Sequence, residues 1–427
     1  MLIPVILGSF FLLIALGFPI AISLGLSSIV ALILYPEIPL IVVVQRLFVA
    51  VDSFPLMAVP LYMLAGFLMG SGGISRRIIN FSNSLVGGVT GGLAHVNILA
   101  SMIFAGISGS AVADTAGIGN IIIPKMIEQK YSRSYSAAVT AISSTIGIVI
   151  PPSIPMVIIG SMLGVSVGKL FLGGIIPGLA MGFSLMFTAY LIAKKNKFGK
   201  SDQKIQLGKI AKSFIESFWS LLMPGIVIGG IVLGIFTPTE AGAVAVVYAL
   251  IVGFLIYREL NLKYIIESLW MTVLGTAKVF FIIATAGLFT WLLTANGFHV
   301  LVGQLLLSIS KSPTVLMAVM VLIILIITTF MESIATLILL LPILFPVAQQ
   351  VGIDSIHFGV MIVISLGIGL VTPPVGLCLY VSADIAGVQI IEASKVLVPF
   401  ILSIIAILAV LLIAPEIITI LPKILMG

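Results

Sequence analysis

The sequence predicts an all-α, polytopic membrane protein built as an inverted repeat. Of its 427 residues, 61% are hydrophobic and only 8% are charged, whereas soluble domains carry about 25% charged residues. Apolar stretches long enough to span a bilayer as a helix recur, for example at 175–192 and 403–420. Continuously apolar runs such as 319–328 lack the alternation of a membrane β-barrel, so helices are favoured.

Charge and cysteine content narrow the function classes. The net charge is +6, and the basic residues lie in loops rather than in a patch interleaved with aromatics, which disfavours nucleic-acid binding. Cys378 is the single cysteine, which excludes an internal disulfide framework, and we interpret it as a small buried hydrophobe. No Lys or Arg precedes Arg46, so we predict a retained first span rather than a cleaved signal.

Landmarks in the first half recur about 220 residues later, which indicates an internal repeat. The clearest pair is Pro151-Pro152, within GIVIPPS, and Pro373-Pro374, within GLVTPPV. Further pairs are Pro4 with Pro224, Pro19 with Pro238, Gly73 with Gly297, and the segment 108–124 with 331–346. We therefore divide the chain into a first repeat (1–193), a basic linker (194–212) and a second repeat (213–427).

The distribution of basic residues predicts that the two halves are inverted. The linker holds seven lysines and one acid, Asp202, and is expected in the cytoplasm. The loop 348–358 of the second half contains no Lys or Arg and is expected outside. This arrangement makes the chain a multi-pass protein with both termini in the periplasm.

Each half is predicted to contain the same series of elements. Apolar stretches give three spans, an amphipathic segment gives an arm, and a stretch with a polar turn gives a re-entrant hairpin. A stretch interrupted by Pro-Pro gives a broken helix, and one more span follows. In the first half these are spans 2–18, 20–35 and 55–71, arm 74–88, hairpin 92–126, broken helix 135–168 and span 172–193. In the second half they are spans 217–235, 240–257 and 275–295, arm 298–312, hairpin 314–347, broken helix 358–387 and span 395–420.

The hairpin tips (105–114 and 328–337) and the two proline breaks predict the functional site. Irregular backbone is tolerated at membrane depth only where it is buried in protein or lines a cavity. Because proline lacks an amide, a break leaves carbonyls free to form an oxygen cage for a small cation. The first cage is expected from Ala105, Ser108, Gly147, Ile150 and Pro152, and the second from Thr329, Glu332, Gly369, Thr372 and Pro374.

An organic anion is expected between the tips, because the N-termini of the half-helices favour negative charge. Its predicted contacts are Ser110, Asp114, Ser333, Thr336 and Thr372. An alternative for Asp114 and Glu332 is a purely structural role, in which each carboxylate accepts hydrogen bonds at the start of a helix. Glu240 is interpreted as a helix cap, and Asp384 as a solvated residue at the end of its broken helix.

The sequence resembles the large membrane subunit of TRAP transporters, the tripartite ATP-independent periplasmic family. The resemblance covers essentially the whole chain and is carried by GGLAHVNILASMIFAGISGSAVADTAG (91–117), GIVIPPS (147–153), FTPTEAGA (236–243) and GLVTPPVG (369–376). One departure is Glu332, where the resemblance leads us to expect aspartate in many relatives.

The resemblance implies uptake of an organic acid, such as a C4-dicarboxylate or a sialic acid, across the bacterial inner membrane. It implies coupling to two or more sodium ions, and an elevator mechanism in which the hairpins and broken helices move against a scaffold. It also implies a periplasmic substrate-binding protein and a small four-helix membrane subunit on a separate chain. No phosphate-binding G-x-x-x-x-G-K-[ST] loop is present, so we expect no nucleotide.

Three other functions remain alternatives. A stand-alone sodium–dicarboxylate symporter would need no binding protein. An intramembrane hydrolase would need two neighbouring acids, Asp114 with Asp384 or Glu332, but the repeat places these acids apart, so we expect no enzyme activity. A passive channel is disfavoured because oppositely oriented hairpins suit alternating access.

Overall fold

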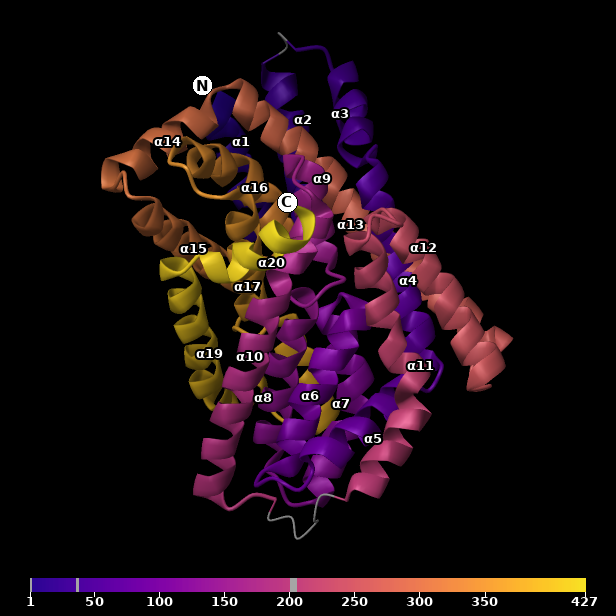
Figure 1. Cartoon of the computed structure of the whole chain (residues 1–427). Coiled ribbons are helices and arrows are strands. Elements are labelled where there is room, and N and C mark those ends of the chain that lie inside the picture. The colour runs from indigo at the N-terminus through magenta and orange to yellow at the C-terminus, as the bar shows by residue number, and fades with distance from the viewer. Residues whose placement is uncertain (1, 36–37, 200–205) are drawn as a thin grey trace.

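A computed structural model describes residues 2–35, 38–199 and 206–427. Within these ranges the chain is helical and forms no β-strand (Figure 1). Eight of the described helices are long and apolar enough to cross a membrane. The structure confirms the predicted class, with two helical hairpins and two interrupted helices.

The first half contains helices α1 to α10. They are α1 (Leu2–Ala15), α2 (Ile20–Leu34), α3 (Ile41–Val51), α4 (Ala58–Ser71), α5 (Ile74–Val86), α6 (Gly92–Ser108), α7 (Ala111–Glu128), α8 (Arg133–Ser144), α9 (Ile154–Leu163) and α10 (Val167–Asn196). Short 3₁₀ turns at Phe54–Met57 and Thr145–Ile148 precede α4 and follow α8.

The second half contains helices α11 to α20. They are α11 (Leu207–Val232), α12 (Pro238–Leu250), α13 (Leu262–Ala295), α14 (Phe298–Ile309), α15 (Pro313–Phe330), α16 (Ser333–Gln350), α17 (Ser355–Gly369), α18 (Leu377–Ala386), α19 (Ile390–Ile413) and α20 (Glu416–Met426). A π-helix at Ile251–Ile256 extends α12.

Several predictions of element bounds are wrong. Helix α3 was missed, and α10, α11 and α13 begin before the predicted 172, 217 and 275. The predicted last span, 395–420, ends early because Pro415 interrupts the helix, and α20 follows as a separate amphipathic helix. The linker 194–212 is helical up to Asn196 and from Leu207, and its residues 200–205 lie outside the described ranges.

The broken helix of each half packs against the hairpin of the other half. Helix α18 packs against α7 and α8, and α9 packs against α16. We call α6–α9 and α15–α18 the inner body. Helices α1–α4 and α11–α13 form an outer set, in which α4 packs against α12 and α13. The arms α5 and α14 lie at opposite ends of the molecule (Figure 1).

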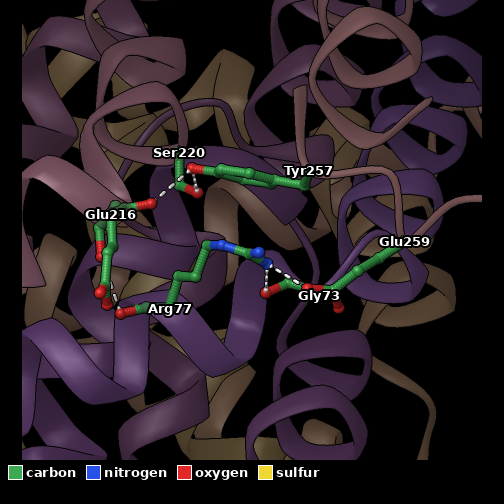
Figure 2. A network of polar contacts seen from close by, with 7 residues as sticks. Gly73, Arg77, Glu216, Ser220, Tyr257 and Glu259 are labelled. Atoms are coloured by element: carbon green, nitrogen blue, oxygen red, sulfur yellow. Dashed lines mark hydrogen bonds and ion pairs between the residues drawn. The ribbon is translucent and has the colours of Figure 1, made fainter. Parts of the chain in front are cut away.

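Arg77 fastens the arm α5 to the outer set (Figure 2). Its Nη1 atom donates to Glu259 Oε1 at 2.7 Å and to the Gly73 carbonyl at 3.0 Å. Its guanidinium carbon lies 3.8 Å from the centroid of the Tyr257 ring. Gly73 has a φ of +77°, and a Cβ there would collide with Glu259, so the start of α5 requires glycine.

The same network reaches α11. Ser217 Oγ donates to the Arg77 carbonyl at 2.9 Å. The Tyr257 hydroxyl donates to the Glu216 carbonyl at 3.1 Å and lies 2.9 Å from Ser220 Oγ (Figure 2). Arg77 therefore joins the arm to two segments of the second half.

We expect Arg77→Ala to lower the thermal unfolding midpoint in detergent by a few degrees. Hydrogen bonds to charged groups in partly buried sites contribute about 2 kcal/mol, and the substitution leaves Glu259 unpaired. Arg76→Ala is the matched control, since Arg76 is the exposed neighbour on the same helix. Equal effects of the two substitutions would show that the network adds nothing to stability.

Glu240 caps α12, as predicted. Its side chain accepts a hydrogen bond from the Thr237 amide at 2.8 Å, and the Thr237 side chain accepts one from the Glu240 amide at 3.3 Å. This reciprocal capping box satisfies two otherwise free amides at the helix start. Asp384 is exposed in the last turn of α18, in agreement with the predicted solvated position.

Candidate functional site: hairpin tips and proline breaks

The first tip is a tight turn between α6 and α7. Gly109 has a φ of +62°, and a Cβ there would lie 2.7 Å from the Pro152 carbonyl oxygen, so glycine permits the close approach. The Gly109 carbonyl accepts a hydrogen bond from the Ile154 amide at 3.4 Å. Ser110 caps α7 by accepting from the Ala113 amide at 3.4 Å. The tip is thereby joined to the break in its own half.

The second tip repeats this arrangement. The Thr329 carbonyl accepts a hydrogen bond from the Val375 amide, just after the second break, at 3.2 Å. Glu332 caps α16 by accepting from the Ala335 amide at 3.0 Å, so it lies at the position that Ser110 holds in the first half. Each half therefore brings its own tip and its own break together.

The two breaks share a backbone feature and differ in capping. The Pro151-Pro152 and Pro373-Pro374 peptide bonds are both cis. Ser153 caps α9 by accepting from the Met156 amide at 3.3 Å, and its hydroxyl donates to the Ile148 carbonyl at 2.5 Å. At the second break the Leu370 carbonyl instead accepts from a backbone amide, that of Cys378, at 2.9 Å.

Asp114 is the charged residue of the first tip. It is fully buried, and its Oδ1 accepts a hydrogen bond from Ser108 Oγ at 2.5 Å. Its Oδ2 is buried and has no hydrogen-bond partner among the described residues. Gly147 lies beside this oxygen, because a Cβ there would be 2.5 Å from Asp114 Oδ2. A buried, unpaired carboxylate oxygen is energetically costly unless a cation or a proton occupies it.

The other residues of the first predicted cage do not all lie near Asp114. Ala105 is buried one turn before the tip, and the Pro152 carbonyl faces Gly109. Ile150 instead packs against α10, where a Cβ at Gly178 would lie 2.4 Å from the Ile150 side chain. The structure thus gathers Ser108 and Gly147 around Asp114, which we had grouped with the anion contacts.

The second predicted cage lies in a more open setting. Gly369 packs against the tip, where a Cβ would lie 2.4 Å from the side chain of Thr328. The hydroxyls of Thr329 and Thr372 donate to carbonyls of their own segments, each at 2.7 Å. Glu332 is half-buried and Pro374 is exposed.

The predicted anion contacts differ in burial and in hydrogen bonding. Ser333 Oγ donates to the Leu366 carbonyl of α17 at 3.3 Å, and the fully buried Thr336 donates to the Glu332 carbonyl at 3.1 Å. Ser333 therefore joins the second tip to α17, whereas Thr336 is bonded within the first turn of α16. Ser110 and Thr372 are the members that stay partly exposed.

The two tips differ in how they are covered. Gly66 of α4 lies so close to the first tip that a Cβ there would be 3.1 Å from Ser108 Cα. Gly106 of α6 is similarly close to Pro224 of α11. At the second tip the side chain of Phe330 is 69% exposed. The first tip therefore packs against α4 and α11 of the outer set, whereas Phe330 of the second tip is not covered by the described chain.

The sequence did not indicate which residues of the outer set pack against the first tip. Gly66 and Pro224 lie far from the tip in sequence, and a glycine inside a helix was the one available signal of a close approach. Cys378 is buried, as predicted, but it also lies beside Asp114 and Thr115, which the sequence did not indicate.

Comparisons with known proteins give a consistent result. Residues 7–417 match the family model described as "Tripartite ATP-independent periplasmic transporter, DctM component". The chain is 41% identical to the sialic acid TRAP transporter large permease protein SiaM of Vibrio cholerae, covering 96% of both proteins. It is 39% identical to the 2,3-diketo-L-gulonate TRAP transporter large permease protein YiaN of Escherichia coli, covering 95% of both.

In two further matches, either the relative is much longer than this chain or the sequence identity is low. The isethionate TRAP transporter permease protein DctMQ of Oleidesulfovibrio alaskensis is 39% identical over 97% of this chain, which spans only 65% of that relative's length. Among solved structures, the Alcanivorax borkumensis YdaH transporter matches with a TM-score of 0.63 over 87% of this chain and 86% of its own. The sequence identity is 14%, so this likeness concerns the fold alone.

Proposed function

The chain belongs to the DctM component family of tripartite ATP-independent periplasmic transporters, and we propose that it imports an organic acid anion in symport with sodium. The named substrates of its relatives, isethionate, sialic acid and 2,3-diketo-L-gulonate, all carry an acid group. These names support the class of organic acid anions and leave the individual substrate open.

The observation that carries sodium coupling is the unpaired Oδ2 atom of Asp114 beside the first break. Sodium is a hard cation that prefers oxygen ligands. Ser108 and the backbone near Gly147 supply neutral oxygens around the one carboxylate. We assign Asp114 to this cation site. A second sodium site at Thr329, Glu332, Gly369, Thr372 and Pro374 follows from the repeat.

Coupling follows from the contacts between tips and breaks. A cation held at a break stabilises the tip that is hydrogen-bonded to it, as Gly109 is to Ile154 and Thr329 is to Val375. An ordered tip raises the affinity for the anion, and by linkage the anion raises the affinity for sodium equally. We place the anion near Ser110 and Thr372, the partly exposed members of the predicted set.

The movement we propose is an elevator. The inner body carries the site, the outer set forms the scaffold, and the arms α5 and α14 connect them. The packing of the first tip against α4 and α11 supports the assignment of the outer set as the scaffold against which the inner body would move. We place the chain in the inner membrane with both termini in the periplasm. A C-terminal tag labelled from the cytoplasm alone would contradict this topology.

We further propose two protein partners. A periplasmic binding protein would deliver the anion. A small membrane subunit on a separate chain would match the part of the longer relative DctMQ that this chain does not span.

Uptake into proteoliposomes tests the proposal. The complete complex with its binding protein should accumulate an organic acid when a sodium gradient is imposed, and an equal potassium gradient should give no accumulation. Equal uptake in potassium would end the sodium proposal. Full uptake by this chain alone would instead favour the stand-alone symporter.

A further inference from the structure

A cavity of about 540 Å³ lies at the foot of the first hairpin, away from the tips. It opens between the arm α5, the start of α6 and the end of α7, at the lower end of the molecule in Figure 1. Cavities that bind small molecules have volumes of roughly 300–1,000 Å³. Its polar lining consists of Asn80, Asn83, Lys125, Glu128, Gln129, Lys130 and Tyr131.

The lining is positively charged overall. Lys125 and Lys130 are exposed, and neither forms an ion pair within the described parts of the chain. Among the described lining residues there are two lysines and one acid, Glu128. The amides of Asn80 and Asn83 add neutral hydrogen-bond donors from the arm.

A buried hydroxyl in the cavity wall also lacks a partner. Tyr131 is 3% exposed, and its hydroxyl makes no hydrogen bond of ordinary geometry to a described residue. Its ring is fixed by packing against Tyr135 and Phe198. Burial raises the pKa of Tyr131, although the Leu93 backbone acts in the opposite direction, so the hydroxyl keeps its proton and is a donor. Among the described residues this donor has no acceptor, and an oxygen atom of a ligand would supply one.

The start of α6 adds a third favourable element. Gly92 and Leu93, in the first turn of this 17-residue helix, line the cavity. Amides of the first turn have no partner within the helix, and they carry the positive end of the helix dipole. The Leu93 amide is directed at the Tyr131 oxygen, so the start of α6 contributes chiefly the positive end of its dipole beside the two lysines.

We propose that this cavity binds a phosphate group, carried either by a small organic phosphate or by the headgroup of an anionic phospholipid. Phosphate offers several acceptor oxygens and negative charge, which match two ammonium groups, amide donors and a helix N-terminus. Basic pockets at the cytoplasmic surface of membrane proteins suit lipid headgroups. The proposal does not depend on what the chain transports.

An occupant would join two parts of the fold. The arm α5 already packs against both α11 of the outer set and α6 of the inner body, and the cavity lies at its contact with α6 and α7. A phosphate held by Asn83 on one side and Lys125 on the other would therefore stabilise the present relation between arm and hairpin.

Thermal unfolding of the purified full chain in detergent tests the site. Glycerol 3-phosphate, titrated at constant ionic strength, probes the soluble source, and micelles containing phosphatidylglycerol instead of phosphatidylcholine probe the lipid source. We expect the midpoint to rise with one of these probes. In the double variant Lys125→Gln/Lys130→Gln, the apparent affinity for that probe should fall about 10-fold or more.

One further variant serves as a control, and another provides a second test of the site. Lys209→Gln removes an exposed lysine near the start of α11, outside the cavity lining, and should leave the response unchanged. Tyr131→Phe keeps the packed ring and removes only the hydroxyl, so it tests the site even if the double variant fails to fold, and it should weaken binding about threefold. A response to glycerol 3-phosphate identifies a soluble ligand, and a response to phosphatidylglycerol alone identifies a lipid. No response to either probe, or responses that Tyr131→Phe and the double variant leave unchanged, would overturn the proposal.

Discussion

Asp114→Asn should reduce sodium-driven uptake about 100-fold or more and remove the stabilisation of the protein by sodium. The substitution preserves the size of the side chain and removes its charge, so a cation beside Oδ2 loses the one carboxylate of the first site. A loss of about 3 kcal/mol in cation binding corresponds to roughly 100-fold in affinity. Without sodium, the variant should unfold at a higher temperature than the wild type, because an uncompensated buried charge has been removed.

The measurement is a pair of unfolding curves, in sodium and in potassium, alongside uptake by the reconstituted complex. Asp384→Asn is the matched control, since Asp384 is an exposed acid on α18 and should keep the sodium response. A normal sodium response in Asp114→Asn would show that the cation binds elsewhere and that this carboxyl group is structural.

Gly106→Ala should slow uptake about 10-fold while leaving sodium binding intact. An alanine Cβ would lie 2.8 Å from Pro224 Cγ, which is closer than van der Waals contact allows. Overpacking of this kind costs about 1–3 kcal/mol. This overpacking would destabilise the conformation in which the first hairpin packs against α11. The sodium response should persist, because the unpaired oxygen of Asp114 lies beside Gly147, whereas the Cβ added at Gly106 would meet Pro224.

Gly225→Ala provides the control for the steric argument. Gly225 follows Pro224 on α11, and a Cβ there would meet nothing within 4 Å. Uptake and stability should therefore match the wild type. If Gly106→Ala transports normally, the contact between hairpin and outer set is not maintained during the cycle. If it instead loses the sodium response, the glycine serves the cation site.

The sequence predicted the features that depend on local chemistry. Proline removes an amide wherever it stands, so the breaks at 151–152 and 373–374 were found from residue type alone. The turn between α6 and α7 carries glycine and serine, and the hairpin was predicted within two residues of its observed end. The capping role of Glu240 followed from its position after Thr237 and Pro238.

What the sequence did not predict depends on contacts between distant segments. Asp114 was grouped with the anion contacts because it lies near Ser110 in sequence, and its proximity to Gly147 arises only when the broken helix packs on the hairpin. Ser333 and Thr336 were expected to contact the anion, but the Ser333 hydroxyl donates to α17 and the Thr336 hydroxyl donates within α16. Helix α3 and the first turns of α13 were also not predicted, although both segments are largely apolar and mostly exposed or half-buried.

The exchange of partners between the halves has a consequence for how the protein is made. Helices α7 and α8 pack against α18, which ends at residue 386 and is synthesised much later. In the same way, α9 packs against the later helix α16. The first half is therefore inserted with polar groups such as Asp114 lacking their final surroundings. Maturation of the inner body must be a late, post-insertion event, and a chain truncated before α18 would expose these surfaces to the quality-control proteases of the membrane.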